Sequence, residues 1–207
     1  DLWGYPQSPG KPSPALLNWF PDYSVGTYTG QSQATWAVTG NDDYVVYGGE
    51  FMSVNGQAQQ GLVRFAKRAT APNSQGPRIS SAAWDVRVTS EAAGTVHVSF
   101  PTNWDRDDKT LVYRVYRDSE SNAPILTQSV DSTFWQTSTV TAVDRGLTAG
   151  SSPRYRVTVT DSTGNVAKAD WTTVTVSGSA ASSYVGSVLD SGPASWWRLG
   201  ETSGTSA

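Results

Sequence analysis

The sequence predicts an all-β protein, and three features of its composition lead to that prediction. The 207 residues include nine Trp and nine Tyr, and aromatic residues are enriched in strands. Charged residues make up only 16% of the chain, whereas disordered chains have many charges and few aromatics. The 19 Gly and 11 Pro residues are typical of short strands joined by turns. At this length the chain has room for one large domain or two small ones.

Residues 77–177 carry the clearest strand pattern. Five segments in this range alternate apolar and polar residues, and a period of two places the apolar side chains on one face of each strand. Several such strands separated by Gly, Asp and Asn turns predict a β-sandwich. The apolar positions, in chain order, are Trp84, Val86, Val88, Val96, Val98, Phe100, Leu111, Tyr113, Val115, Tyr155, Val157, Val159, Val174 and Val176.

Residues 1–68 are expected to form β-hairpins after an irregular start. Four of the eleven prolines fall within Asp1–Pro14, which predicts an extended, non-helical stretch. Two β-rich runs then flank the turn sequence Gly40–Asp43. A second hairpin turn is expected at Asn55–Gly56, and it leads to a short strand at Gly61–Phe65.

Two short segments divide the chain. Residues 69–76 are polar and poor in large apolar side chains, and residues 178–183 are rich in Ser, Gly and Ala, so both have the composition of linkers. Residues 184–207 are too few to bury the adjacent Trp196 and Trp197, so we expect them to begin a domain that is incomplete here. The chain begins without Met, which suggests a piece of a longer protein.

Three stretches carry a family resemblance in the middle of the chain: Thr95–Phe100, Leu111–Arg117, and the corner that runs from Leu147 to Tyr155. Through them, residues 77–177 resemble a fibronectin type III domain, an immunoglobulin-like β-sandwich with no required disulfide. The resemblance implies a tyrosine corner, in which the Tyr155 hydroxyl fixes the chain crossover. Phe100 stands where the family usually has Trp, and it would fill the same part of the core.

The two ends carry other resemblances. Tyr47–Gly56 and Gly61–Phe65 resemble the closing repeat of bacterial extracellular β-propeller-like proteins, and Val188–Gly204 resembles the opening of a laminin-G or concanavalin A-like jelly roll. Together the resemblances imply a window in a long modular protein of the kind common in actinobacteria, secreted or attached to the cell surface. Such modules bind glycans or other proteins, or hold an enzyme at a distance. They imply a non-catalytic chain.

Composition excludes several classes of function. The net charge of −3 and the lack of a Lys/Arg cluster argue against a nucleic-acid binder. No apolar run approaches the roughly 18 residues that a transmembrane helix needs. The chain has no Cys, which excludes a disulfide scaffold, a thiolate zinc site and a cysteine nucleophile. We expect no cofactor.

Two side chains are considered for catalysis and assigned structural roles instead. His97, the only histidine, lies between Val96 and Val98 and is expected to point outward from its strand, as an ordinary surface histidine. Glu50 is expected to pair with Arg64 or Arg68 of the same hairpin unit. The acids in turn contexts, such as Asp161 in residues 161–165, are expected to cap their own backbone.

Asn103, Asp105 and Asp107 are the best candidates for a metal site. Oxygen ligands at alternate positions imitate the start of a calcium loop, but the sixth position has Asp108 in place of Gly and the twelfth has Arg114 in place of Glu. An EF-hand is therefore excluded. A looser calcium site and a solvated turn remain as alternatives.

The tryptophans are the remaining functional signal, because an aromatic face stacks on a sugar ring. Trp84 and Trp171 lie in strand patterns, so we expect them in the core. Trp104 and Trp135 lie in or near loops, where they either cover the open end of the sandwich or bind a ligand. Trp197 neighbours Trp196, and one of the two is expected to be left over for a contact outside the core. The candidate ligand-binding residues are Trp104, Trp135 and Trp197.

The leading functional hypothesis is a spacer with an adhesion or carbohydrate-binding region, whose partners are extracellular glycans, surface proteins or other modules of the same chain. Two competing hypotheses place the modules beside the catalytic domain of a secreted polysaccharide-degrading enzyme, or in an extracellular fibre or phage tail. Trp104→Ala and Trp135→Ala would separate glycan binding from a purely structural role.

Overall fold

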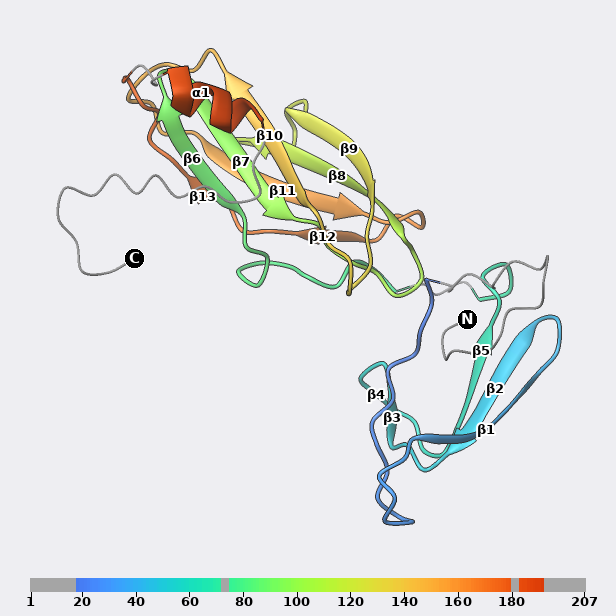
Figure 1. Cartoon of the computed structure of the whole chain (residues 1–207). Coiled ribbons are helices and arrows are strands. Elements are labelled where there is room, and N and C mark those ends of the chain that lie inside the picture. Colours follow the sequence, from blue (N-terminus) through green and yellow to red (C-terminus); the bar gives the residue numbers. More distant parts are fainter. Residues whose placement is uncertain (1–17, 72–74, 180–182, 192–207) are drawn as a thin grey trace, which may run out of the picture. The chain divides into compact units, whose positions relative to one another are not determined.

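The protein is all-β in the residues that the structure describes. The computed structural model covers residues 18–71, 75–179 and 183–191, and within them it has thirteen strands and one short helix (Figure 1). Contacts divide the chain into an N-terminal unit, residues 1–75 with 106–109, and a sandwich unit, residues 76–105 with 110–207. Each unit is described by itself below.

The sandwich unit consists of two antiparallel sheets. Strands next to each other in space are not always next in sequence, since the chain crosses from one sheet to the other between β7 and β8 and again on either side of β10. The first sheet has the order β10 (Thr139–Arg145), β7 (Thr95–Pro101), β6 (Arg87–Ala92). The second has the order β12 (Val166–Lys168), β11 (Arg154–Thr160), β8 (Thr110–Arg117), β9 (Leu126–Asp131), and β13 (Thr172–Thr173) also pairs with β11.

The core lies between these two sheets, where the predicted alternation places the apolar side chains. The inward residues of β7, β8 and β11 are almost completely buried, and Phe100 packs against the ring of Trp84 with the centroids 6.0 Å apart. Burial of this many apolar side chains is the main force that holds the two sheets together. The buried apolar residues are Trp84, Val96, Val98, Phe100, Leu111, Tyr113, Val115, Val140, Ala142, Tyr155, Val157, Val159, Ala167, Ala169 and Val176.

A buried polar cluster connects three strands of the sandwich. The hydroxyl of Tyr155 on β11 donates to Asp144 Oδ2 on β10 at 2.9 Å, and Arg117 Nη1 on β8 lies 2.9 Å from the same oxygen. The acceptor is therefore a side chain from the opposite sheet. Burial and the Asp144 carboxylate raise the pKa of Tyr155, so its hydroxyl remains a hydrogen-bond donor.

The N-terminal unit contains the two hairpins that the sequence predicts. Asn41 Oδ1 accepts hydrogen bonds from the backbone of Asp43 and Tyr44 and fixes the first turn. Asn55 and Gly56 have positive φ angles of 52° and 77°, as a tight hairpin turn requires. The strands are β1 (Thr35–Gly40), β2 (Tyr44–Gly49) and β5 (Leu62–Ala66) in one sheet, and β3 (Ser53–Val54) with β4 (Gln57–Ala58) in the other.

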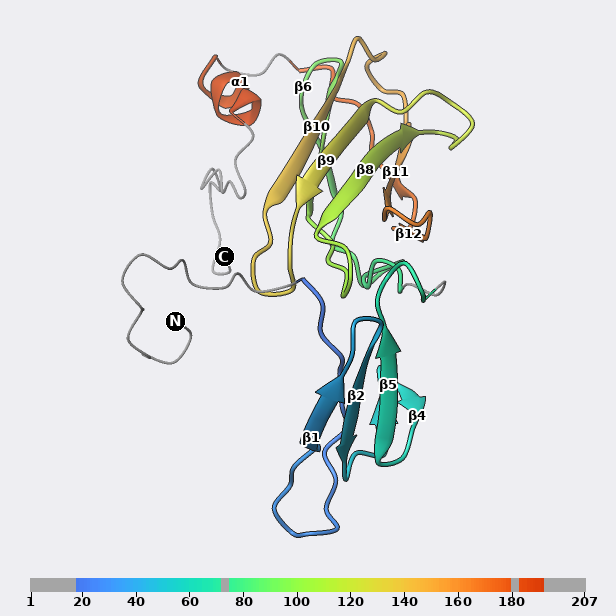
Figure 2. The ribbon, with the colours of Figure 1, turned by 90° about the vertical axis from the view of Figure 1, so that its right-hand side faces the viewer.

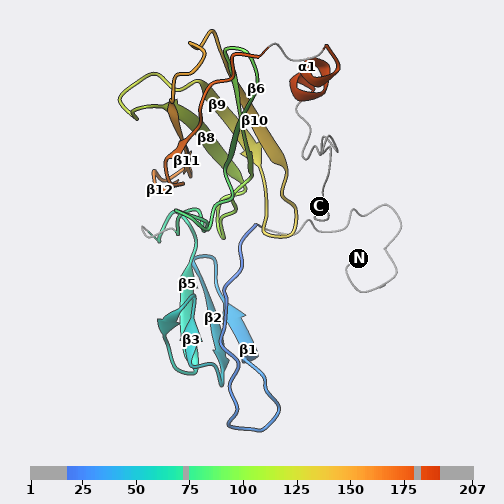
Figure 3. The ribbon, with the colours of Figure 1, turned by 90° about the vertical axis from the view of Figure 1, so that its left-hand side faces the viewer.

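One short segment of this all-β chain is helical. Residues Ser183–Asp190 form the helix α1, whose sequence repeats apolar residues with helical spacing at Tyr184, Val185, Val188 and Leu189. Figures 2 and 3 show α1 on the side of β6 and β10, away from β11 and β12. Asp1–Pro14, Trp196 and Trp197 lie outside the described residues.

The prediction that His97 is an exposed surface histidine is wrong. His97 lies opposite Thr89 and Val143 in the middle strand of its sheet, on the face that does not contact the core. Its side chain is nevertheless buried, with a relative exposure of 6%. Alternation therefore predicts the correct face of β7, but the His97 side chain is covered there although Arg87 and Thr89 of β6 are exposed.

Candidate functional site

Three aromatic side chains gather at loops of the sandwich unit. Trp104 follows β7, while Phe134 and Trp135 lie between β9 and β10. The ring centroids of Trp104 and Phe134 are 5.8 Å apart, those of Phe134 and Trp135 are 4.7 Å apart, and both pairs meet edge to face. Phe134 and Trp135 are 52% and 53% exposed, and Trp104 is partly buried. We call these three residues the aromatic cluster.

A tight turn holds the two exposed rings in place. Thr133 and Gln136 exchange two backbone hydrogen bonds, of 3.1 and 3.2 Å, and leave Phe134 and Trp135 as the two central residues. Neither central residue has a positive φ, which fits an unprimed turn. Because Thr133 is buried, the base of the turn is anchored while the rings project from it.

Asn103 anchors the third ring. Its carboxamide oxygen accepts from the backbone nitrogens of Ile79 and Trp104 at 3.0 and 2.9 Å, and its amide nitrogen donates to the Ile79 carbonyl at 2.7 Å. The Asn103 carbonyl accepts from the hydroxyls of Tyr113 and Ser132. Ser132 precedes the tight turn, so this fully buried asparagine fixes both loops of the aromatic cluster.

The same hydrogen bonds bear on the calcium hypothesis. A calcium loop needs the Asn103 carboxamide oxygen as a ligand, but this oxygen accepts two backbone hydrogen bonds. Within residues 18–71, 75–179 and 183–191, no group of three or more His, Asp or Glu side chains is arranged to hold a metal ion. The described residues therefore give no support to calcium at Asn103, Asp105 and Asp107.

The structure brings together two of the three candidate ligand-binding residues. Trp104 and Trp135 both contact Phe134, and Trp197 lies outside the described residues. Sequence reasoning missed Phe134. The available signal was its position beside Trp135 between two polar residues, because both central residues of a tight turn project to solvent.

Of the two tryptophans expected in the core, one lies elsewhere. Trp84 is buried as expected, but Trp171 is partly exposed, and the guanidinium groups of Arg154 and Arg156 lie over its ring. Trp171 lies between β12 and β13, outside regular strand geometry. The alternation of side chains expected for a strand therefore does not apply to it.

Glu50 is predicted to pair with Arg64 or Arg68, but among the described residues its carboxylate binds Thr29 and Gln33 instead. Its carboxylate accepts from the backbone nitrogens of Thr29 and Gln33, at 2.9 and 3.2 Å, and from the Thr29 hydroxyl. These hydrogen bonds, chiefly the one from the Thr29 backbone, hold the pKa of Glu50 below its ordinary value. The Glu50 side chain therefore closes the loop 26–33.

Asp161 caps its own backbone as predicted, whereas the 41–43 turn is fixed by the Asn41 side chain and Asp43 pairs with Lys67. Asp161 Oδ1 accepts hydrogen bonds from the backbone of Thr163 and Asn165 at 2.9 and 2.8 Å. These and further hydrogen bonds from the two side chains outweigh the effect of burial and hold the pKa of Asp161 below its ordinary value. Asp161 therefore shapes the loop between β11 and β12.

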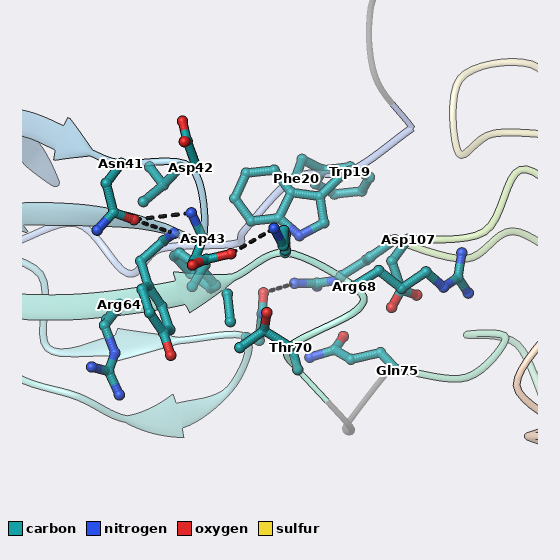
Figure 4. Close-up of a pocket in the computed structure, with 18 residues that line it drawn as sticks. Trp19, Phe20, Asn41, Asp42, Asp43, Arg64, Arg68, Thr70, Gln75 and Asp107 are labelled. Carbon is teal, nitrogen blue, oxygen red and sulfur yellow. Dashed lines mark hydrogen bonds and ion pairs between the residues drawn. The ribbon is translucent and has the colours of Figure 1, made fainter.

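A second candidate surface is a pocket of about 850 Å³ in the N-terminal unit. Figure 4 shows Trp19 and Phe20 along one side of it and the Asn41 turn along another. The ring of Tyr44 also lines the pocket. Its lining includes an ion pair, Lys67 with Asp43 at 2.5 Å, which reduces the charge that it offers to a ligand. Phe134 and Trp135 of the aromatic cluster are more exposed, at 52% and 53%, than Trp19, at 37%.

Comparisons with known proteins add no assignment to either surface. No family model matches the chain, and no curated protein is significantly similar to it. The one helix in the described part of the chain, α1, is far too short to cross a bilayer.

Proposed function

We propose that the sandwich unit binds carbohydrate through the aromatic cluster of Trp104, Phe134 and Trp135. The observation that carries this proposal is the pair of half-exposed rings at the tip of a turn that is closed by two backbone hydrogen bonds. A ring that is already fixed in the free protein loses little conformational freedom when it stacks on a sugar. Contiguous exposed apolar surface marks an interaction site more often than a single exposed residue does.

The chemistry of the site fits a non-catalytic contact. Aromatic faces stack on the C–H groups of a pyranose ring, and the neighbouring exposed Asp131 and Gln136 can bind hydroxyl groups. The only histidine of the chain, His97, is buried in β7. We therefore propose a binding module and no enzyme.

The wider context is proposed from the sequence resemblances. The two sheets, with strand orders β10-β7-β6 and β12-β11-β8-β9, are compatible with a fibronectin type III domain that serves as a spacer. We propose that this spacer belongs to a secreted bacterial surface protein, between a propeller-like repeat and a laminin-G-like module. The competing contexts are an accessory region of a polysaccharide-degrading enzyme and an extracellular fibre or phage tail.

A glycan array followed by calorimetry tests the binding proposal. Trp135→Ala should weaken the affinity for the best array hit about tenfold, because it removes the most exposed ring of the aromatic cluster. Trp104→Ala and Phe134→Ala should weaken it as well. Trp36→Ala is the matched control, since Trp36 in the N-terminal unit is 54% exposed and Trp135 is 53% exposed.

Two results would count against the proposal. Silence across neutral, acidic and amino-sugar glycans would remove carbohydrate binding altogether. Equal losses for Trp36→Ala and Trp135→Ala would show adhesion to exposed tryptophan in general. Light scattering at high protein concentration tests the fibre context. Large assemblies would support that context, and a monomer would contradict it.

A further inference from the structure

The outer face of the second sheet carries an arginine–tryptophan stack. The guanidinium carbons of Arg154 and Arg156 each lie 4.7 Å from a ring centroid of Trp171. Both arginines belong to β11, two residues apart, and so project from the same face. That face points away from the core, because the alternate residues Tyr155 and Val157 are fully buried.

Two more cations lie on the same face. Arg114 of β8 and Lys168 of β12 both pair with Thr158, on either side of β11. Arg114 reaches along the face to Thr160, with Nη1 3.3 Å from the hydroxyl oxygen. Adjacent strands are about 5 Å apart, so the four positive groups share one compact area. We call Arg114, Arg154, Arg156, Lys168 and Trp171 the cationic face.

The negative groups near the cationic face are fewer. Glu120 binds Arg156 at 2.9 Å and Lys168 at 2.6 Å. Asp118 is exposed and accepts the Arg154 backbone N–H, whereas the Arg154 guanidinium donates to the Asp118 carbonyl. Asp170 is exposed beside Trp171 in the sequence. The area thus remains net positive on a chain whose net charge is −3.

We propose that the cationic face binds an acidic polysaccharide, one that carries carboxylate or sulfate groups along its length. Guanidinium groups donate paired hydrogen bonds to such oxyanions, and the Trp171 stack with the Asp118 and Glu120 contacts holds two of them in place before binding. Both guanidinium groups contact the ring of Trp171, so we assign this ring the role of positioning the arginines.

The charge distribution favours a polysaccharide over a nucleic acid. Nucleic acids carry a phosphate at every nucleotide and need an extended set of cations, which an acidic chain would repel outside this one area. A polysaccharide with more widely spaced charges matches four cations on one sheet face. The cationic face shares no residue with the aromatic cluster, so the two proposals stand separately.

The test measures binding of the whole chain to immobilised polymers by biolayer interferometry. Polygalacturonate supplies carboxylates, dextran sulfate supplies sulfates, neutral dextran is the uncharged comparison, and duplex DNA is the nucleic-acid comparison. We expect binding to one or both acidic polysaccharides that weakens as salt is added, because exposed charges are screened. The double variant R154Q/R156Q should bind about tenfold more weakly.

Control variants keep the result interpretable. R87Q removes an exposed arginine of β6, on the other sheet, and should leave binding unchanged. R154K/R156K keeps both charges and should restore part of the affinity, which a loss of folding would not allow. Near-ultraviolet circular dichroism verifies that each variant is folded.

Three outcomes would overturn the proposal. These are no binding to either acidic polymer, equal binding by wild type and a folded R154Q/R156Q variant, and tighter binding to DNA than to both acidic polysaccharides. Binding of neutral glycans by the aromatic cluster should survive R154Q/R156Q, so failure of one proposal is distinguishable from failure of the other.

Discussion

The Asp144 carboxylate accepts hydrogen bonds from two side chains inside the sandwich. It thereby connects residues that are far apart in sequence. The Tyr155 hydroxyl and Arg117 both approach its Oδ2 atom at 2.9 Å. Asp144 itself is almost completely buried, so the energy of its carboxylate depends on these two donors. The resemblance to the tyrosine corner implied a role for the hydroxyl, and the acceptor could not be inferred from sequence because it comes from another sheet.

Tyr155→Phe should lower the free energy of unfolding by about 1–2 kcal/mol, since it removes one hydrogen bond to a buried charged acceptor and leaves the ring in place. Urea denaturation measures the change. Tyr116→Phe, on the outer face of β8, is the control and should have almost no effect. An equal effect of both variants would contradict the assigned role of the Tyr155 hydroxyl.

The Glu50 carboxylate makes the stability of the N-terminal unit depend on pH. Its pKa is lowered in the folded state from an ordinary value of 4.5, chiefly by the Thr29 backbone hydrogen bond. The carboxylate therefore stabilises the fold above about pH 4.5, and that contribution is lost as the pH falls through the lowered pKa.

Glu50→Gln should reduce the melting temperature at neutral pH and flatten its fall on acidification, because the neutral amide no longer titrates. Thermal unfolding at several pH values measures both effects. Asp42→Asn, which removes an exposed carboxylate from the neighbouring hairpin turn, should keep the wild-type pH dependence. A Glu50→Gln variant with an unchanged acid limb would argue against the loop closure by Glu50.

Among the elements, the turn between β6 and β7 depends most visibly on one glycine. Gly94 has a φ of +64°, and a Cβ there would lie 2.9 Å from the Leu147 carbonyl oxygen. Gly146 has a φ of +74° with nothing within 4 Å of such a Cβ, so the two positions differ in their surroundings and share their backbone conformation.

Gly146→Ala should cost about 1–2 kcal/mol of stability, the ordinary cost of an L-residue with positive φ. Gly94→Ala should cost more, because the hydrogen bond from the Leu147 N–H to the Gly94 carbonyl must also shift. Chemical denaturation of the two variants gives the comparison. Equal losses would show that the close carbonyl has no influence.

The predictability of each strand follows from its inward residues. β7, β8 and β11 bury an unbroken alternation of large apolar residues, and the sequence predicts them. β10 places Val140, Ala142 and Asp144 inward. Because one of these residues is small and another is charged, the alternation of apolar and polar residues is not visible in its sequence. β9 is an edge strand with exposed polar residues, which a search for alternation misses.

At the scale of the whole molecule, the two units differ in how much apolar surface they bury. All but a few of the buried apolar residues in the described ranges belong to the sandwich unit, and the N-terminal unit contributes only Phe51 and Val54. A small core leaves little free energy to offset chain entropy. The N-terminal unit should therefore be the less stable of the two.

Calorimetry of the whole chain should show two unfolding transitions. Glu50→Gln should shift the lower one and Tyr155→Phe the upper one, because each residue contributes to a different unit. A single transition that both variants shift together would mean that the units unfold as one.

The candidate site was partly accessible from sequence at this scale. The loop positions of Trp104 and Trp135, and the ability of tryptophan to stack on a sugar, suggested these two residues. Their shared contact with Phe134 depends on Asn103, which hydrogen-bonds two loops about 30 residues apart and could not be inferred from sequence. The cationic face was hidden for the same reason. Its charges are scattered through the sequence and are brought together only when β8, β11 and β12 pair.

The burial of His97 has a practical consequence. With one imidazole in the whole chain, diethyl pyrocarbonate has a single histidine to acylate, in the middle strand of a sheet. A side chain that is 6% exposed reacts only when the surrounding structure opens. The rate of that labelling therefore reports the rate at which the sandwich opens around His97. It needs no engineered probe and is measured as a change in the mass of the peptide that contains His97.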